Sequence, residues 1–468
     1  MSKEEIFQQG KIRIISIIQN ACLGAFLSGY TGAELSYAFD AVKENLQLNQ
    51  NEYLYNIIFT VSIILGSFLG TVLYSQLHQY STKRIIMVMA DLIFIASVTF
   101  RFDTWEAFAL QRFLKGISNG LNLCSGLVYI REICPDDFSS KAICIFQINV
   151  NMGIVLANLI SMPLQSNQSS SQGEKTSQYW KFVFCFPLLI ALIRAYVLIF
   201  IFDFDTPFSY YQQEHIHKGQ KLLKKLYFPD ESQVIFETYR NYQEDQQPTF
   251  KVRWINAAIV FAIQQMCGIN SIIQQSNTSI NQYTQNKQTI AILQLFMNLI
   301  LLSMAILTYF LIDKYTQRIQ KSMMTLGCTL LGFSLIAMVL LQKIEISQIY
   351  QIINVAAYFI IFNSTLGPVT LIYIADISKD NVMSLGFYSY WITYMLSQGL
   401  QMTNNSFIPL IFAFSCFLGA YYYYTFWYPT KGRIFYDINI QLNTYQTFYK
   451  QLFQGFQLEE TTQKDKQN

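Results

Sequence analysis

This 468-residue sequence contains few charged residues. Only 13% of its residues are Asp, Glu, Lys or Arg, and 52% are hydrophobic, whereas a soluble domain carries about a quarter charged residues. This composition excludes an ordinary soluble domain and favours a chain that lies in a lipid bilayer. The formal net charge of +3 gives no reason to expect a nucleic-acid partner.

Groups that would bind a metal or a cofactor are also scarce. There are three histidines, and the eight cysteines form no C-x-x-C pair, so a zinc site and a disulfide framework are not expected. No phosphate-binding G-x-x-x-x-G-K-[ST] motif occurs, which argues against direct use of ATP. We therefore expect no cofactor, no metal and no enzyme activity.

Long apolar segments make up most of the sequence. About 20 mainly apolar residues cross the hydrocarbon core of a bilayer. Twelve such segments are predicted, at 13–39, 54–77, 84–101, 107–131, 141–165, 180–202, 253–280, 288–312, 321–342, 348–375, 383–403 and 406–428. The only large polar break, 203–252, divides them six and six and is expected to form short amphipathic helices.

The positions of Lys and Arg predict the orientation. With a cytoplasmic N-terminus, 23 of the 32 lie in inner segments, 6 in outer loops, and 3 within spans as Arg112, Lys115 and Arg194. We therefore expect both termini and the central loop in the cytoplasm, with the plasma membrane favoured over an internal one. The loop after Gln165 would face outward, and its Asn167-Gln168-Ser169 triplet fits a glycosylation acceptor.

The two halves of the sequence resemble each other. STKR (81–84) after the second span corresponds to DKYTQR (313–318) after the eighth, and YIREICP (129–135) to YIADISK (373–379). Two related six-helix halves are typical of secondary transporters, with the solute site between them near the midplane. The expected domains are two bundles (1–202 and 253–428), a cytoplasmic linker (203–252) and a cytoplasmic tail (429–468).

Polar residues inside the predicted spans are candidates for a solute path, because they are costly there. Most are neutral amides, which suit a neutral polyhydroxy solute because they both donate and accept hydrogen bonds; hydrogen bonds between helices are the alternative for any one of them. Gln264, Gln265 and Asn270 lie on one span, where Gly268 permits a break in the helix. The full set is Arg112, Gln147, Asn149, Asn151, Gln264, Gln265, Asn270, Asn298, Asn363 and Trp391.

Four charged residues lie at equivalent cytoplasmic positions of the two halves. Glu132 and Asp376 end the fourth and tenth spans, and Arg84 and Arg318 lie in the equivalent basic loops. Opposite charges there would hold the halves together until the protein opens inward. Marking of membrane topology alone would explain the arginines but not the carboxylates.

Six motifs in order resemble the sugar porter family of the major facilitator superfamily, which includes the facilitative glucose transporters. The resemblance covers roughly residues 20 to 440. The motifs are QRFLKGISNGL (111–121), YIREICP (129–135), IFQINVNMGI (145–154), QQMCGIN (264–270), GPVTLIYIAD (367–376) and YPTKGR (428–433). The resemblance implies two six-helix bundles around a central site that opens to each side in turn.

The resemblance also implies a sugar site. Gln147, Gln264, Gln265, Asn270 and Trp391 match sugar-contacting positions, with Asn363 at a less certain one. The motifs depart from the family pattern at several points. Leu371 replaces a tryptophan, DTPF (205–208) stands where E-S-P-R is usual, and the loop motifs have lost glycines and acids.

Residues of the first and fourth spans bear on whether transport is coupled to protons. Proton-coupled members of this family carry an acid directly after Gly-Tyr in the first span, paired with an arginine of the fourth. Here Thr31 follows Tyr30 while Arg112 is kept, and Glu34 is the nearest carboxylate, about 4.5 Å further along the helix. Glu34 would meet Arg112 only if the span were shifted by a turn, so a uniporter is favoured.

The sequence thus predicts an all-α membrane protein that moves a small neutral polar solute, with a hexose favoured, by alternating access. A proton symporter that uses Glu34 and a non-transporting sugar sensor are the alternatives. Only 39 residues follow Pro429, which favours transport over a sensor with a long signalling tail. The solute and the lipid bilayer are the expected partners.

Overall fold

A computed structural model describes most of the chain. The described residues are 3–48, 51–99, 103–134, 136–166, 173–212, 215–226, 250–273, 280, 283–284, 286–314, 316–344, 348–403, 407–428 and 430. Asn167, with its proposed glycosylation triplet, lies outside them, as do 227–249 of the central loop and the tail from 431 onward.

Helices account for nearly all of the described residues, and no strand occurs among them. Over its described residues, each of the twelve predicted spans coincides with one helix or with consecutive helical pieces. The first bundle comprises α1 (Lys3–Asn45), α2 (Glu52–Leu77), α3 (Lys83–Thr99), α4 (Trp105–Ile133), α5 (Asp136–Ser166) and the sixth span, made of α6 (Gly173–Cys185), α7 (Pro187–Tyr196) and a π-helical turn (Val197–Ile201).

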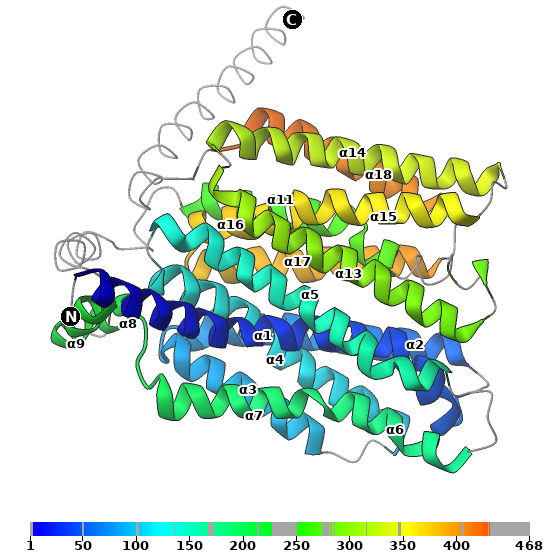
Figure 1. Cartoon of the computed structure of the whole chain (residues 1–468), viewed down its shortest axis with the longest axis horizontal. Helices are drawn as coiled ribbons and strands as arrows, with labels where there is room; N and C mark the ends of the chain where they lie inside the picture. Colours follow the sequence, from blue (N-terminus) through cyan, green and yellow to red (C-terminus); the bar gives the residue numbers. More distant parts are fainter. Residues whose placement is uncertain are drawn as a thin grey trace, which may run out of the picture.

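The second bundle follows two short helices, α8 (Pro207–Gln212) and α9 (Ile216–Leu226). Its members are α11 (Phe250–Met266), α13 (Lys287–Leu311), α14 (Gln317–Lys343), α15 (Gln348–Ser364) with α16 (Leu366–Ile377), α17 (Asp380–Met402) and α18 (Ile408–Phe426). α2 packs against α17 and α5 against α13 where the bundles meet. Figure 1 shows the first bundle below the second.

Nine helical segments among the described residues are long and apolar enough to cross a membrane by length and composition alone. The helices of the third, fourth and eleventh predicted spans, α3, α4 and α17, are not among them. α3 has only 17 residues, and most side chains of α4 are buried by neighbouring helices. A helix that other helices surround needs no apolar surface toward lipid, so α4 can carry Arg112 and Lys115.

Both bundles have their loops at two faces. We call the face where α1 begins the N-terminal face; it carries α8 and α9 and lies at the left of Figure 1. The starts of α3, α5 and α17 and the ends of α4 and α16 also lie at this face. Residues far apart in the sequence therefore meet there.

Glycines let the helices of the first bundle approach closely. A Cβ added to Gly66 or Gly70 of α2 would lie 2.1 or 2.2 Å from a carbonyl oxygen of α4. A Cβ on Gly116 or Gly120 of α4 would lie 2.3 or 2.1 Å from a carbonyl oxygen of α2. Small residues four apart on both helices are a known way to bring backbones together in membranes, and here they fix the position of α4.

The second bundle has two interrupted helices. Gly268 adopts φ +84°, which ends α11 and lets a further helical turn begin, as the sequence predicts. A Cβ at Gly268 would lie 2.6 Å from the ring of Phe412. The Tyr358 hydroxyl donates to the Cys267 carbonyl at 2.8 Å, so the break leaves this carbonyl satisfied. The second interruption is at Thr365, between α15 and α16.

The glycine contact predicts a position-specific loss of stability. Gly120→Ala should lower the free energy of unfolding by about 1–3 kcal/mol or more, since a methyl group must push α2 and α4 apart. Gly399→Ala is the matched control, because an added Cβ there meets nothing within 4 Å. Thermal unfolding of the purified protein in detergent measures both. Equal midpoints would show that this contact does not limit stability.

Candidate functional site

A cavity of about 600 Å³ lies between the two bundles, a size typical of small-molecule sites. Its wall includes residues of α1, α2, α4 and α5 from the first bundle and of α13 and α17 from the second. Ser36, Asp40 and Asn56, near the face opposite the N-terminal face, are exposed lining residues. The cavity therefore reaches solvent on that side.

Two of the predicted sugar-contacting residues line this cavity. Asn270 follows the break at Gly268, and Trp391 lies in the middle of α17. The Trp391 indole N–H donates to the Thr71 hydroxyl at 3.0 Å, and this hydrogen bond joins α17 to α2. Asn270 donates to the Gln265 side-chain carbonyl at 2.9 Å, so Gln265 is held directly behind it.

The remaining predicted amides lie behind the cavity wall. Gln264 is 5% exposed; its amide N–H₂ is 3.3 Å from the Gly367 carbonyl, and its side-chain oxygen is buried without a hydrogen-bond partner in the structure. Asn363 of α15 accepts a hydrogen bond of 3.0 Å from Asn151 of α5. Gln147 donates to Asn151 at 3.4 Å. Gln147 and Asn363 thus meet through Asn151, across the bundle interface.

Asn298 and Asn149 make other contacts. The Asn298 amide donates to the Tyr37 hydroxyl at 2.7 Å, joining α13 to α1, and Tyr37 lines the cavity. Asn149 exchanges hydrogen bonds with Gln19 inside the first bundle. Asn149 therefore has the role of an amide that joins helices.

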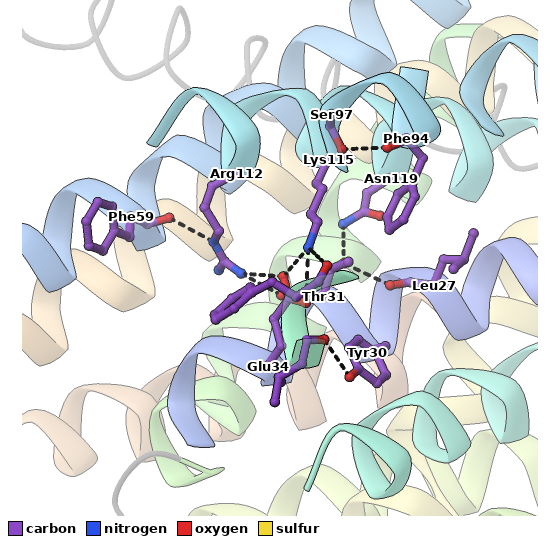
Figure 2. Close-up of polar contacts among 12 residues, drawn as sticks. Leu27, Tyr30, Thr31, Glu34, Phe59, Phe94, Ser97, Arg112, Lys115 and Asn119 are labelled. Carbon is purple, nitrogen blue, oxygen red and sulfur yellow. Dashed lines mark hydrogen bonds and ion pairs between the residues drawn. The ribbon is translucent and has the colours of Figure 1, made fainter. Parts of the chain in front are cut away.

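A buried charge cluster lies beside the cavity (Figure 2). The carboxylate of Glu34 on α1 is 3.1 Å from the Arg112 guanidinium and 2.8 Å from the Lys115 ammonium, both on α4. All three side chains are at most 2% exposed. Arg112 lines the cavity, whereas Glu34 and Lys115 lie behind it.

Glu34 meets Arg112 without the shift by a turn that the sequence seemed to require. The Arg112 guanidinium reaches both the Thr31 carbonyl, at 2.9 Å, and Glu34. Asn119 donates to the Thr31 hydroxyl at 3.0 Å, so Thr31, at the position of the missing acid, still faces α4. The long arginine side chain spans the distance.

The bundles are joined by ion pairs at the N-terminal face. Lys83, at the start of α3, lies 3.1 Å from Asp380 of α17 and 3.6 Å from Glu132 of α4. The Tyr74 hydroxyl donates to Asp380 at 2.6 Å. These side chains are buried, so the cavity is closed toward the N-terminal face.

Two further ion pairs join the bundles at this face, and we call this line of contacts between the bundles the seam. Arg131 lies 3.4 Å from Asp376, and Lys141 of α5 pairs with Asp313 at the end of α13. Asp376 also accepts a hydrogen bond of 2.9 Å from Thr430. Each of the two ion pairs connects one bundle to the other.

The segment that begins the linker lies in the same seam. Thr206 donates to Glu132 at 2.5 Å. The ring of Phe208 on α8 lies 3.6 Å from the Lys379 ammonium, a cation–π distance. The linker is therefore tied to both bundles at the closed face.

Of the four predicted latch residues, the structure places Glu132 and Asp376 at the seam with basic partners. Arg84 instead bonds to the first bundle and to the start of the linker, with its guanidinium 3.1 Å from the Leu198 carbonyl and its backbone N–H 3.3 Å from Asp205. Arg318 is exposed and makes no ion pair among the described residues. Lys83 has the place at the seam that the basic loop motif suggested for Arg84.

The sequence motifs assign no role to Lys83, Asp380 or Lys115. For Lys115, the available signal was a second cation in a predicted span, one helical turn after Arg112. For Lys83, the only signal was its place next to Arg84 in the basic loop motif. Such a motif does not say which of the two side chains faces the seam.

Two bundles of membrane-spanning helices around a polar cavity that is closed at one face define a secondary transporter. The comparisons with known proteins agree. The family described as "Sugar (and other) transporter" matches residues 17–442, and the chain belongs to this family. It is an integral multi-pass membrane protein and a carrier of sugars, not an enzyme.

Individual relatives are distant but similar in length. Hexose transporter 1 of Plasmodium falciparum (isolate 3D7) is 21% identical, with 89% of this chain and 90% of that protein aligned. Plastidic glucose transporter 4 of Arabidopsis thaliana is 23% identical, with 92% and 81% aligned. The proton:xylose symporter XylE, bound to 6-bromo-6-deoxy-D-glucose, shares the fold with a TM-score of 0.82 at 16% identity, over 92% and 99% of the chains.

The geometry predicts which amides matter for the solute. Asn270→Ala and Gln264→Ala should each weaken sugar binding roughly 5- to 150-fold, the effect of losing about 1–3 kcal/mol from a buried polar network. The concentration dependence of transport measures this. Asn354→Ala is the control, because Asn354 bonds to Ser334 inside the second bundle, away from the cavity. Unchanged affinity in both test variants would remove these residues from the site.

The seam predicts a conformational effect of Lys83. Lys83→Gln should favour opening at the N-terminal face, because Asp380 and Glu132 lose the cation between them. Spin labels at Tyr80 and Lys314, one on each bundle and both exposed, should report longer distances. Lys43→Gln is the control, since Lys43 pairs with Glu52 inside one bundle. Identical distance distributions in all three proteins would contradict the role of Lys83.

Proposed function

We propose that this carrier is a facilitative hexose uniporter that works by alternating access. Two relatives are named as carriers of hexose or glucose, and the cavity offers amides and an indole ring. Amides match sugar hydroxyls, and an aromatic ring can cover the apolar face of a sugar. Such a site suits a neutral solute of hexose size.

In this proposal the sugar binds between Asn270 and Trp391, which line the cavity. Gln265 orients Asn270, and the free side-chain oxygen of Gln264 is available to a hydroxyl after a small movement. Gln147 and Asn363 complete the site at the bundle interface through Asn151. The second bundle would thus supply most of the sugar contacts.

Alternating access is supported by the asymmetry between the two faces. Ion pairs close the N-terminal face, while exposed residues line the cavity at the other. The fold is also more similar to sugar-bound XylE, with a TM-score of 0.82, than to its inward-open form, at 0.70. Opening inward would require separation of the Lys83, Arg131 and Lys141 pairs.

The single observation that carries the uniport assignment is the position of Glu34 between two cations. A carboxylate must gain and lose a proton to couple transport to a proton gradient. Ion pairs with Arg112 and Lys115 both favour the charged form. The proton symporter remains the second candidate because Glu34 is a buried carboxylate in contact with Arg112.

The orientation is part of the same proposal. We place the N-terminal face in the cytoplasm, because the inner segments of this arrangement hold 23 of the 32 Lys and Arg residues. The cavity then opens outward, as uptake at the plasma membrane requires. Protease or label accessibility of each face in intact cells tests the orientation.

Uptake into proteoliposomes tests the function. Labelled hexose should reach equal concentrations inside and outside, whether or not a pH gradient is imposed. Labelled amino acids and nucleosides provide the substrate controls. Accumulation above the outside concentration, abolished by a protonophore and by Glu34→Gln, would instead identify a proton symporter with Glu34 as its coupling residue.

A further inference from the structure

Lys115 is the second cation that pairs with the Glu34 carboxylate, next to Arg112. Lys115 and Arg112 are three residues apart on α4, so they project from the same side of the helix. The Lys115 ammonium lies 2.8 and 3.1 Å from the two oxygens of Glu34 and 3.0 Å from the Phe184 carbonyl. In Figure 2, Lys115 and Arg112 approach Glu34 from one side.

With Arg112 and Lys115 protonated and Glu34 ionised, the cluster holds an excess of one positive charge. Two cations face one carboxylate, and all three are buried. Backbone carbonyl oxygens stabilise the excess: Thr31 and Phe59 accept from Arg112, and Phe184 accepts from Lys115. The rings of Phe94 and Phe184, 5.7 and 5.3 Å from the ammonium, add cation–π attraction.

The charge count decides whether Glu34 can take up a proton. Protonation would leave two cations beside a neutral acid, raising the net charge of the cluster from one to two. Charges repel strongly in a buried site of low dielectric, and no further carboxylate among the described residues contacts this cluster. The two cations therefore favour the charged form of Glu34, against the burial of the carboxylate, which favours its neutral form.

We propose that Lys115 is a positioning residue that keeps Glu34 ionised through the transport cycle and so makes sugar movement independent of the proton gradient. The inference rests on the proposed uniport and gives it a molecular cause. It also makes a claim that uniport alone does not make, namely that one side chain separates the protein from a proton-coupled carrier.

Removal of Lys115 changes the charge count in a specific way. In Lys115→Met, the ionised pair of Glu34 and Arg112 is neutral, and its protonated form carries one positive charge. The surrounding carbonyls already accommodate that charge in the wild type. A proton could then bind Glu34 from the cavity, where Arg112 forms part of the wall, and leave on the other side after reorientation.

The other titratable groups near the cluster do not supply an alternative proton site. Tyr30 of α1 and Cys185 of α6 lie near Glu34, and Tyr394 of α17 lies near Arg112. Tyrosine and cysteine are ordinarily neutral at pH 7. The remaining contacts from α2 and α3 are the Phe59 carbonyl and the Phe94 ring.

Gradient-driven uptake in proteoliposomes tests the proposal with four proteins. An inward gradient of one pH unit permits up to about tenfold accumulation at one proton per sugar. Lys115→Met should accumulate hexose toward that limit, whereas the wild type and Lys115→Arg, which keeps the charge, should only equilibrate it. Glu34→Gln combined with Lys115→Met should lose the accumulation, because the proton-binding carboxylate is gone.

The outcomes separate the two proposals. Accumulation by the wild type would overturn uniport and the role of Lys115 together. Equal distribution in both the wild type and Lys115→Met would overturn the role of Lys115 alone, as would accumulation that survives the loss of Glu34. If Lys115→Met does not transport, infrared titration decides. A protonated-carboxyl band that Glu34→Gln removes must appear on acidification in Lys115→Met, at a pH where the wild type shows no band that Glu34→Gln removes; any other pattern contradicts the proposal.

Discussion

Each buried charge among the described residues of the first bundle lies next to an opposite charge, and this requirement organises the bundle. Glu34 lies between Arg112 and Lys115. Arg194 lies 2.6 Å from Asp91 and 2.7 Å from Asn122. A buried ion without such partners costs several kcal/mol, so these contacts restrict how the helices can slide. The glycine contact between α2 and α4 fixes the position of α4, the helix that carries Arg112, Lys115 and Asn122.

The second bundle differs from the first in its interrupted helices and in the groups that face the cavity. Its helices are interrupted at Gly268 and Thr365, and its cavity-facing groups are neutral amides and aromatic rings. Interrupted helices in a bilayer are tolerated where protein or a water-filled cavity satisfies the backbone, and Tyr358 does so for the Cys267 carbonyl. Arg112 of the first bundle and Trp391 of the second both line the cavity.

The sequence predicted those features of this arrangement that depend on a single segment, and it missed those that depend on how several helices pack. Apolar runs gave the spans, because length and hydropathy are properties of single segments. Gly268 gave the break, because only glycine readily adopts its positive φ. The contact of Glu34 with Arg112 depends on the rotation and axial shift of α1 against α4, which the packing of all the helices sets. A register argument along one helix therefore misplaced it by a turn.

The same reasoning explains why Lys83 rather than Arg84 lies at the seam. Consecutive residues of a helix point about 100° apart, so a basic loop motif does not say which side chain faces the other bundle. The consequence for opening is favourable. Lys83 lies near Glu132 of its own bundle as well as Asp380 of the other. Separation of the bundles would therefore leave its charge with a partner, while Asp380 would become accessible to water. The seam can thus be stable when closed without leaving an unpaired buried cation when it opens, which is the energetic condition that a carrier needs to alternate between its two faces.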